Sequence, residues 1–291
     1  MKPRDMILAA LVAVIWGVNF VVSAIFVDHM PPMLFAAIRF TFVVFPAILF
    51  VPRPGIGWRK TFGVGFFIGV MQFGLMFIAM RLGMSGGLAS LLIQLQTLFT
   101  VLLAAAFLAE RPTRKQVLGI ALGLVGLAVV GMGRGGAAML PFLMMVAAAF
   151  FWGCGNVVMR SAKTKSGLSL TVWSGTVAPL PMFAASYLFD GPDAISAALS
   201  QINWWFIVGM FYTAIIATLV GFAVWSRLLA RYPAGLVVPW SLVTPPAGIV
   251  TAILVRGEYP TVLEVVGAVI IILAVLLTTL NLRSLRLRWT P

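Results

Sequence analysis

The stretch GLASLLIQLQTLFTVLLAAAFLAERPTRKQVLG, residues 87 to 119, returns in altered form as GLVVPWSLVTPPAGIVTAILVRGEYPTVLEVVG, residues 235 to 267. A shift of 148 positions (235 minus 87) aligns a Gly-Leu pair, a Glu, a Pro-Thr pair and a Gly, within wider windows of 83 to 131 and 231 to 279. Each copy follows a segment with a Trp-Gly pair and an Asn, at Trp16 and Asn19 and at Trp152 and Asn156. Repetition in an apolar chain is typical of membrane transporters built from two repeats. We predict one repeat over residues 1 to 137 and a second over 138 to 291.

The composition indicates a protein that lies in lipid. Of 291 residues, 62% are hydrophobic and 9% are charged, and the mean hydropathy is +1.10. The net charge of +13 would also suit nucleic acid, but the Lys and Arg residues sit in short breaks between apolar runs. Positive loops beside a membrane explain that pattern, so we expect membrane lipid and no nucleic acid as a partner. The single cysteine, Cys154, cannot form an intramolecular disulfide.

A membrane-spanning helix needs about 20 mainly apolar residues. The chain divides into ten such segments, which predicts an all-α integral membrane protein with ten transmembrane helices. The segments are 6–26, 33–51, 61–81, 85–108, 115–133, 139–160, 168–189, 204–227, 233–255 and 261–281.

The positions of Lys and Arg predict the orientation. With the N-terminus inside, 16 of the 20 fall on the cytoplasmic side and only three outside, while Arg39 lies within a helix. Both termini are then cytoplasmic, and five helices per repeat make the second repeat inverted relative to the first. The three external residues are Arg81, Arg134 and Arg256, and the loops counted as cytoplasmic include Lys163, Lys165, Arg283, Arg286 and Arg288.

The two Glu loops carry a family resemblance. Glu110-Arg111-Pro112-Thr113 opens into a helix with Gly119, Gly123 and Gly126, and Glu258-Tyr259-Pro260-Thr261 precedes Gly267. With the paired Trp-Gly segments, this order resembles the drug/metabolite transporter superfamily, and within it the EamA-type exporters. The resemblance covers nearly the whole chain and is nearest to the YddG-type exporters of aromatic and other neutral amino acids.

That resemblance implies two five-helix halves related by an axis in the membrane plane. It also implies a central cavity lined by the first four helices of each half, and export of small metabolites from a bacterial inner membrane. The fifth helices would pack at the periphery, and Gly119, Gly123 and Gly126 would give one of them a smooth face for close helix packing.

Polar and aromatic residues at mid-membrane depth are the candidates for the cavity, because a polar group facing lipid costs free energy. Trp16 and Asn19 share a helix face, as do Trp152 and Asn156. Each Trp could contact substrate or fill the core between the repeats, and each Asn could bond a neighbouring carbonyl instead. The further candidates are Gln72, Gln94, Gln96, Tyr212, Trp240, Ser241 and Thr244.

Two of these candidate segments have internal geometry of their own. Gln94 and Gln96 point in nearly opposite directions on an α-helix, so only one should face the cavity. Trp240 and Thr244 form an i, i+4 pair among Pro239, Pro245 and Pro246, and those prolines should kink or unwind the helix.

Arg39 is the one clearly intramembrane ionisable residue, seven residues after Pro32. Such a residue marks a functional site by default. It could receive a substrate carboxylate, or it could cap carbonyls across the repeat interface as a structural element.

The seven acids all fall in loops, tails or first turns of helices. Without a carboxylate at mid-membrane, facilitated diffusion is the favoured mode, with proton exchange the alternative. No phosphate-binding loop and no cluster with metal-ligand spacing occurs, so no ATP, metal or other cofactor is expected.

Three function classes are compatible with the fold. An exporter of small metabolites, most simply neutral or aromatic amino acids and acting as a monomer, explains the repeats and the uncharged midplane. A multidrug or organic-cation exporter suits Trp16, Trp152 and Trp240 but lacks a buried acid. A membrane-embedded enzyme lacks any nucleophile, base or metal set, so we expect no enzyme.

Overall fold

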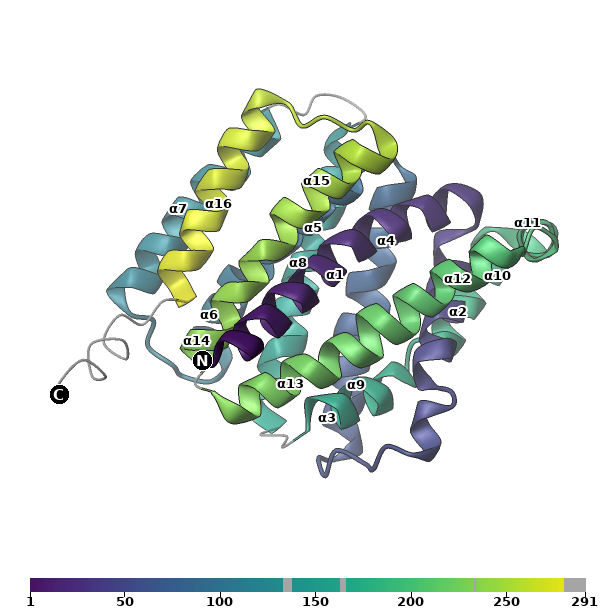
Figure 1. The fold of residues 1–291 in the computed structure, drawn as a ribbon, viewed down its shortest axis with the longest axis horizontal. Coiled ribbons are helices and arrows are strands. Elements are labelled where there is room, and N and C mark those ends of the chain that lie inside the picture. Colours follow the sequence, from purple (N-terminus) through teal and green to yellow (C-terminus); the bar gives the residue numbers. More distant parts are fainter. Residues whose placement is uncertain (133–137, 163–165, 233, 280–291) are drawn as a thin grey trace.

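The computed structural model describes residues 1–132, 138–162, 166–232 and 234–279. Ten helical spans in these ranges are long and apolar enough to cross a membrane. This confirms the predicted all-helical membrane architecture (Figure 1). Arg134, Lys163, Lys165, Arg283, Arg286 and Arg288, which entered the orientation count, lie outside the described residues.

The first five spans contain three interrupted helices. Their elements are α1 Pro3–His29; α2 Pro32–Val44 with η1 Ala47–Leu49; α3 Trp58–Val64, η2 Gly65–Gln72 and α4 Phe73–Arg81; α5 Gly86–Leu92, η3 Ile93–Leu95 and α6 Gln96–Phe107; and α7 Arg114–Met132. Here η2 is a π-helix, whereas η1 and η3 are 3₁₀-helices.

The last five spans repeat this plan. Their elements are α8 Met139–Ala162; α9 Gly167–Gly175 and α10 Pro179–Phe189; α12 Trp204–Phe211, the π-helix η5 Tyr212–Val220 and α13 Gly221–Arg231; α14 Ala234–Val237, the 3₁₀-helix η6 Val238–Val243 and α15 Thr244–Arg256; and α16 Val262–Thr279. The additional helix α11, Gly191–Ser200, lies between the seventh and eighth spans.

The shift of 148 positions read from the sequence also aligns the breaks in the helices. The start of α4 at Phe73 maps onto the start of α13 at Gly221, and the start of α6 at Gln96 maps onto the start of α15 at Thr244. The first helices need a different shift, because Trp16 maps onto Trp152 at 136 positions (152 minus 16). The 12-residue difference between the two shifts corresponds to the insertion that contains α11.

Local sequence explains why the fifth helix of each half begins where it does. Thr113 exchanges hydrogen bonds with Gln116 across the first turn of α7, and Thr261 does the same with Glu264 in α16. Both are capping boxes. Just before each, the backbone adopts the left-handed conformation, at Gly257 with φ 65° and at Ala109 with φ 54°. Ala109 adopts it at a steric cost that its glycine counterpart avoids.

The fifth helices, α7 and α16, pack against each other at one edge of the bundle (Figure 1). A Cβ atom added at Gly119 would lie 2.8 Å from the carbonyl oxygen of Ala274, and one at Gly126 would lie 2.8 Å from Ile271. The glycine face predicted from the sequence is therefore a packing surface, and it faces the other fifth helix.

Candidate functional site

The first helix of each half crosses a broken helix of the other half. α1 packs on α15, and α8 packs on α6. A Cβ added at Gly17 would lie 2.6 Å from the carbonyl oxygen of Thr244, and one at Gly153 would lie 2.9 Å from the Cβ of Phe99. Only glycine allows these approaches. The Trp that precedes each glycine is thereby held at the interface between the halves.

An uncharged polar cluster lies at the crossing of α6 and α8. Asn156 Nδ2 donates to Gln96 Oε1 and to Thr100 Oγ1, the latter at 3.0 Å, while Thr100 Oγ1 donates to the Gln96 carbonyl at 2.6 Å. All three side chains are half-buried. They have hydrogen-bonding capacity but no charge, which suits a polar, neutral or zwitterionic solute. We call these residues the amide cluster.

The two 3₁₀ breaks are joined by Gln94. Its Nε2 donates to the carbonyl oxygen of Ser241 at 3.4 Å, which links η3 to η6. Gln94 is buried and Gln96 is half-buried in the amide cluster. The two glutamines thus have different partners, although the α-helical angle expected between them does not apply through the 3₁₀ turn, where each residue turns the helix by about 120°.

Trp16 has a defined partner on the eighth span. Its Nε1 donates to the carbonyl oxygen of Ala217 at 2.8 Å. Its ring centroid lies 5.4 Å from that of Phe222 and 5.1 Å from that of Trp225. Ala217 belongs to the π-helix η5. Trp152, its counterpart, packs instead against the main hydrophobic core.

Tyr212 and Trp240 both make contacts between helices. Tyr212 Oη donates to the carbonyl oxygen of Ile15 at 2.8 Å, so it ties η5 to α1. Trp240 packs against a small core around Ala9. The proposed i, i+4 pair of Trp240 with Thr244 does not share a face in the way expected, because η6 turns at three residues per turn. The prolines were expected to kink or unwind the helix, and the structure has the more tightly wound 3₁₀-helix η6 at Pro239, with Pro245 and Pro246 in the first turn of α15.

A second set of polar residues is buried in the interior. Arg39 and Gln72 are buried, and so is Asn19. One side-chain atom of each, Arg39 Nη1, Gln72 Oε1 and Asn19 Oδ1, has no hydrogen-bond partner. The oxygen atoms of Ser23 and Thr244 are buried without a partner as well.

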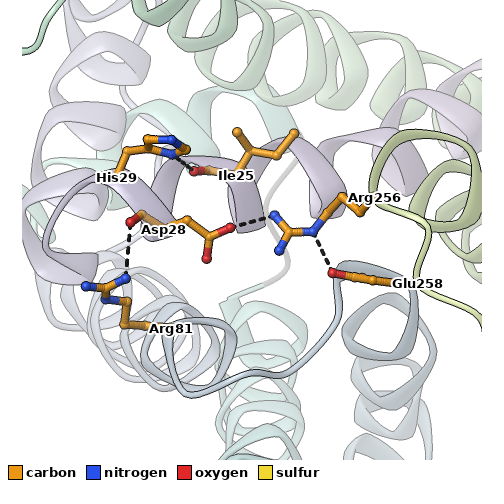
Figure 2. A network of polar contacts seen from close by, with 6 residues as sticks. All are labelled: Ile25, Asp28, His29, Arg81, Arg256 and Glu258. Carbon is orange, nitrogen blue, oxygen red and sulfur yellow. Dashed lines mark hydrogen bonds and ion pairs between the residues drawn. The ribbon is translucent and has the colours of Figure 1, made fainter.

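Ion pairs hold both ends of the bundle. At one end, which we call the Asp28 end, Arg256 contacts Asp28 at 2.6 Å and also bonds Glu258, while Arg81 donates to the Asp28 carbonyl at 3.1 Å (Figure 2). At the other, the Asp5 end, Tyr232 donates to Asp5, which also lies 3.6 Å from Arg231. A further pair there joins Glu110 to Arg160 at 2.8 Å.

Two hollows open at the Asp28 end. The larger, about 610 Å³, lies between α1 and the α11–α12 region, and its lining includes Phe26, His29 and Trp205. The smaller, about 430 Å³, lies between α5 and α15 beside Glu258. Neither of these two hollows is lined by the amide cluster.

The family assignment follows from comparison with known proteins. The model of the EamA-like transporter family matches residues 4–132 and 139–280, once in each half. The chain belongs to this family. It is therefore a multi-pass membrane transporter of the drug/metabolite transporter superfamily and not an enzyme.

Two named relatives match over nearly their full length, and a third matches over about two thirds. A probable amino-acid metabolite efflux pump of Salmonella typhimurium is 39% identical over 98% of this chain and 98% of its own. One of Escherichia coli is 39% identical over 99% of this chain and 97% of its own. A probable terminal-alkyne amino-acid exporter of Streptantibioticus cattleyicolor is 31% identical over 68% of this chain and 65% of its own. A crystal structure with a TM-score of 0.62 and 19% identity covers 99% of this EamA transporter and 100% of the other chain, which shows a common fold.

Two elements of the interior were missed by the sequence reasoning. Phe222 and Trp225, three residues apart on one helix, face Trp16. Their spacing alone could have indicated a shared face. The π-helices had no recognisable signal in the sequence.

Proposed function

We propose that this EamA transporter exports neutral amino acids or closely related metabolites, aromatic ones among them, across the bacterial inner membrane. The amide cluster of Gln96, Thr100 and Asn156 is the observation that carries the proposal. It joins the two halves, it is half-buried, and its donors and acceptors are uncharged. The names of the relatives, two probable amino-acid metabolite efflux pumps and a probable terminal-alkyne amino-acid exporter, support the same class of solute.

The mechanism is alternating access by facilitated diffusion. Movement of one half against the other would expose the amide cluster first to one side of the membrane and then to the other. The substrate's polar groups replace hydrogen bonds that the cluster now makes internally, so binding leaves few groups unpaired. No acid of the sequence lies at mid-membrane to carry a proton. The Asp5 end faces the cytoplasm in this proposal, as the Lys and Arg bias predicts, and the transporter acts as a monomer.

A multidrug or organic-cation exporter is the competing function. Trp16 with Phe222 and Trp225 forms an aromatic surface that could hold a cation. Arg39 is buried in the interior and repels such a substrate. The amino-acid proposal is therefore favoured.

The test is uptake into proteoliposomes of radiolabelled neutral and aromatic amino acids, nucleosides and quaternary ammonium compounds. We expect saturable uptake of at least one neutral amino acid that unlabelled substrate competes away. Transport of the quaternary ammonium compounds alone would overturn the proposal.

A further inference from the structure

Arg39 is a buried cation without a counter-ion. Its guanidinium donates through Nη2 to Thr218 Oγ1 at 3.1 Å, and its Cζ lies 4.5 Å from the ring centroid of Phe73 and 5.8 Å from that of Phe77. Nη1 is buried and unpartnered. None of the ion pairs among the described residues includes Arg39. Aromatic faces and one hydroxyl offset only part of the cost of burying this charge.

Other buried atoms at a similar depth, which can accept hydrogen bonds, also lack partners. Gln72 Oε1 and Asn19 Oδ1 have no hydrogen-bond partner, and neither does Ser23 Oγ. These residues lie on α1, at the end of η2 and on α2, which pack against one another or on the common neighbour α4. Counted along the helix axes from the Asp28 end, all of them lie about 9 to 15 Å deep. One unpaired guanidinium nitrogen and several unpaired oxygens therefore occupy one layer.

The unpaired groups match the two charged ends of an α-amino acid. A guanidinium binds a carboxylate through parallel N–H donors, and amide or hydroxyl oxygens accept from an ammonium group. A purely structural role for Arg39 would be expected to pair its donors with backbone carbonyls, which a helix break readily supplies. The described contacts do not include such a bond.

A column of aromatic rings separates this layer from the larger hollow. Phe26, which lines the hollow, stacks on Phe35 with 4.9 Å between the ring centroids. The ring centroids of Phe35 and Phe77 lie 4.8 Å apart, and those of Phe77 and Phe73 lie 5.5 Å apart. Phe73 lies against the guanidinium. Successive ring contacts therefore run from the lining of the 610 Å³ hollow to Arg39.

We propose that Arg39 binds the α-carboxylate of the transported amino acid on its way out, with Asn19, Ser23 and Gln72 accepting from its ammonium group. The solute leaves the amide cluster, reaches this layer when the aromatic column parts, and exits through the hollow beside Phe26. This inference rests on the proposed function, and it adds a carboxylate requirement that the amide cluster alone would not impose.

The experiment compares transport of an amino acid with that of its amide, which keeps the side chain and ammonium group but lacks the carboxylate. The pair is L-phenylalanine with L-phenylalanine amide, repeated with L-leucine and L-leucine amide, at a pH where both amines are protonated. Proteoliposomes contain wild type, Arg39→Gln, Arg39→Lys or, as a control in the peripheral helix, Leu122→Ala. We expect wild type and Leu122→Ala to prefer the acid by about tenfold or more, as sites built to pair a charged group do.

Arg39→Gln should abolish the preference by lowering acid transport, with little change for the amide, and Arg39→Lys should restore part of it. Thr218→Val, which leaves the charge but removes its hydrogen bond, should raise the KM of the acid more than that of the amide. If Arg39→Gln fails to assemble, the acid-to-amide preference of wild type and the KM values of Thr218→Val still test whether Arg39 binds the carboxylate. Equal transport of acid and amide by wild type, or equal loss of both in the Arg39 variants, would overturn the carboxylate site at Arg39. Neither result would overturn the proposed function. If wild type transports no amino acid in the wider panel, the proposed function falls and this inference falls with it.

Discussion

Arg256, the last residue of α15, reaches across to Asp28 near the end of α1 and holds its carboxylate at 2.6 Å, while also bonding Glu258. Glu258 is the repeat counterpart of Glu110, which pairs with Arg160 at 2.8 Å near the end of α8. Each repeated Glu thus belongs to an ion-pair group that reaches the first helix of the other half, at opposite ends of the bundle. Both groups are formed in this structure.

Asp28→Asn should favour opening at the Asp28 end. Partly exposed ion pairs contribute about 1 kcal/mol or less, so we expect a shift of up to roughly fivefold in the open population. The measurement is the rate at which a thiol reagent labels Ser23→Cys, a fully buried position, in a background with Cys154→Ser. Glu110→Gln, which breaks the pair at the other end, should not raise this rate. An unchanged rate in Asp28→Asn would show that the ion pair does not restrain opening.

The Asp28 end should face the periplasm. A cysteine placed at the exposed Asp193 of α11 should react with an impermeant thiol reagent added to intact spheroplasts, and one at the exposed Arg59 of α3 should react only after lysis. The expectation rests on the Lys and Arg bias. The opposite labelling pattern would invert the assignment of every loop.

Substrate should equilibrate without an imposed ion gradient. Because no acid lies at mid-membrane, purified protein in liposomes should bring internal substrate to the external concentration and no higher. The check is accumulation measured with and without a pH gradient across the liposome. Uphill accumulation driven by the pH gradient alone would instead establish proton coupling.

The amide cluster should be required for transport but not for assembly. Gln96→Ala and Asn156→Ala each remove an interhelical hydrogen bond and a group that we expect to contact substrate. At about 1 to 3 kcal/mol per lost partner, transport should fall by roughly five- to 150-fold. Leu122→Ala in α7 serves as the control and should retain transport. Wild-type rates in both cluster variants, at equal amounts of monodisperse protein, would move the binding site elsewhere.

Both glycine crossings should be intolerant of a side chain. Gly17→Ala and Gly153→Ala each force a methyl group against atoms 2.6 to 2.9 Å away, so we expect each to lower stability by about 1 to 3 kcal/mol. Gly131→Ala is the matched control, because its Cβ would meet Phe142 at an ordinary 3.4 Å. Thermal unfolding in detergent measures all three. A melting temperature of Gly17→Ala equal to that of Gly131→Ala would contradict the close crossing.

The sequence predicted the ten spans well because the signals there are additive over many residues. The predicted segment 139–160 is α8 Met139–Ala162, and the glycine face of α7 packs as a smooth surface should. The interior was harder to predict, because a site depends on the turn type of a few residues. The 3₁₀ turn at Ile93–Leu95 contains no proline, and the π-helix at Tyr212–Val220 has no compositional mark. Without those turns, the partners of Gln94 and Trp16 could not be assigned.

The equivalent placement of the helix breaks has a consequence for the direction of flux. Two halves whose helices are interrupted at matching positions should bend with similar stiffness. The free-energy barriers to opening toward either side of the membrane should therefore be of comparable height. Under the proposed function, such a protein would act as a two-way facilitator in which metabolite concentrations decide the net flow. The exception to this balance is α11, present in only one half. Any preference of the empty carrier for one facing should therefore be sought in that 10-residue helix.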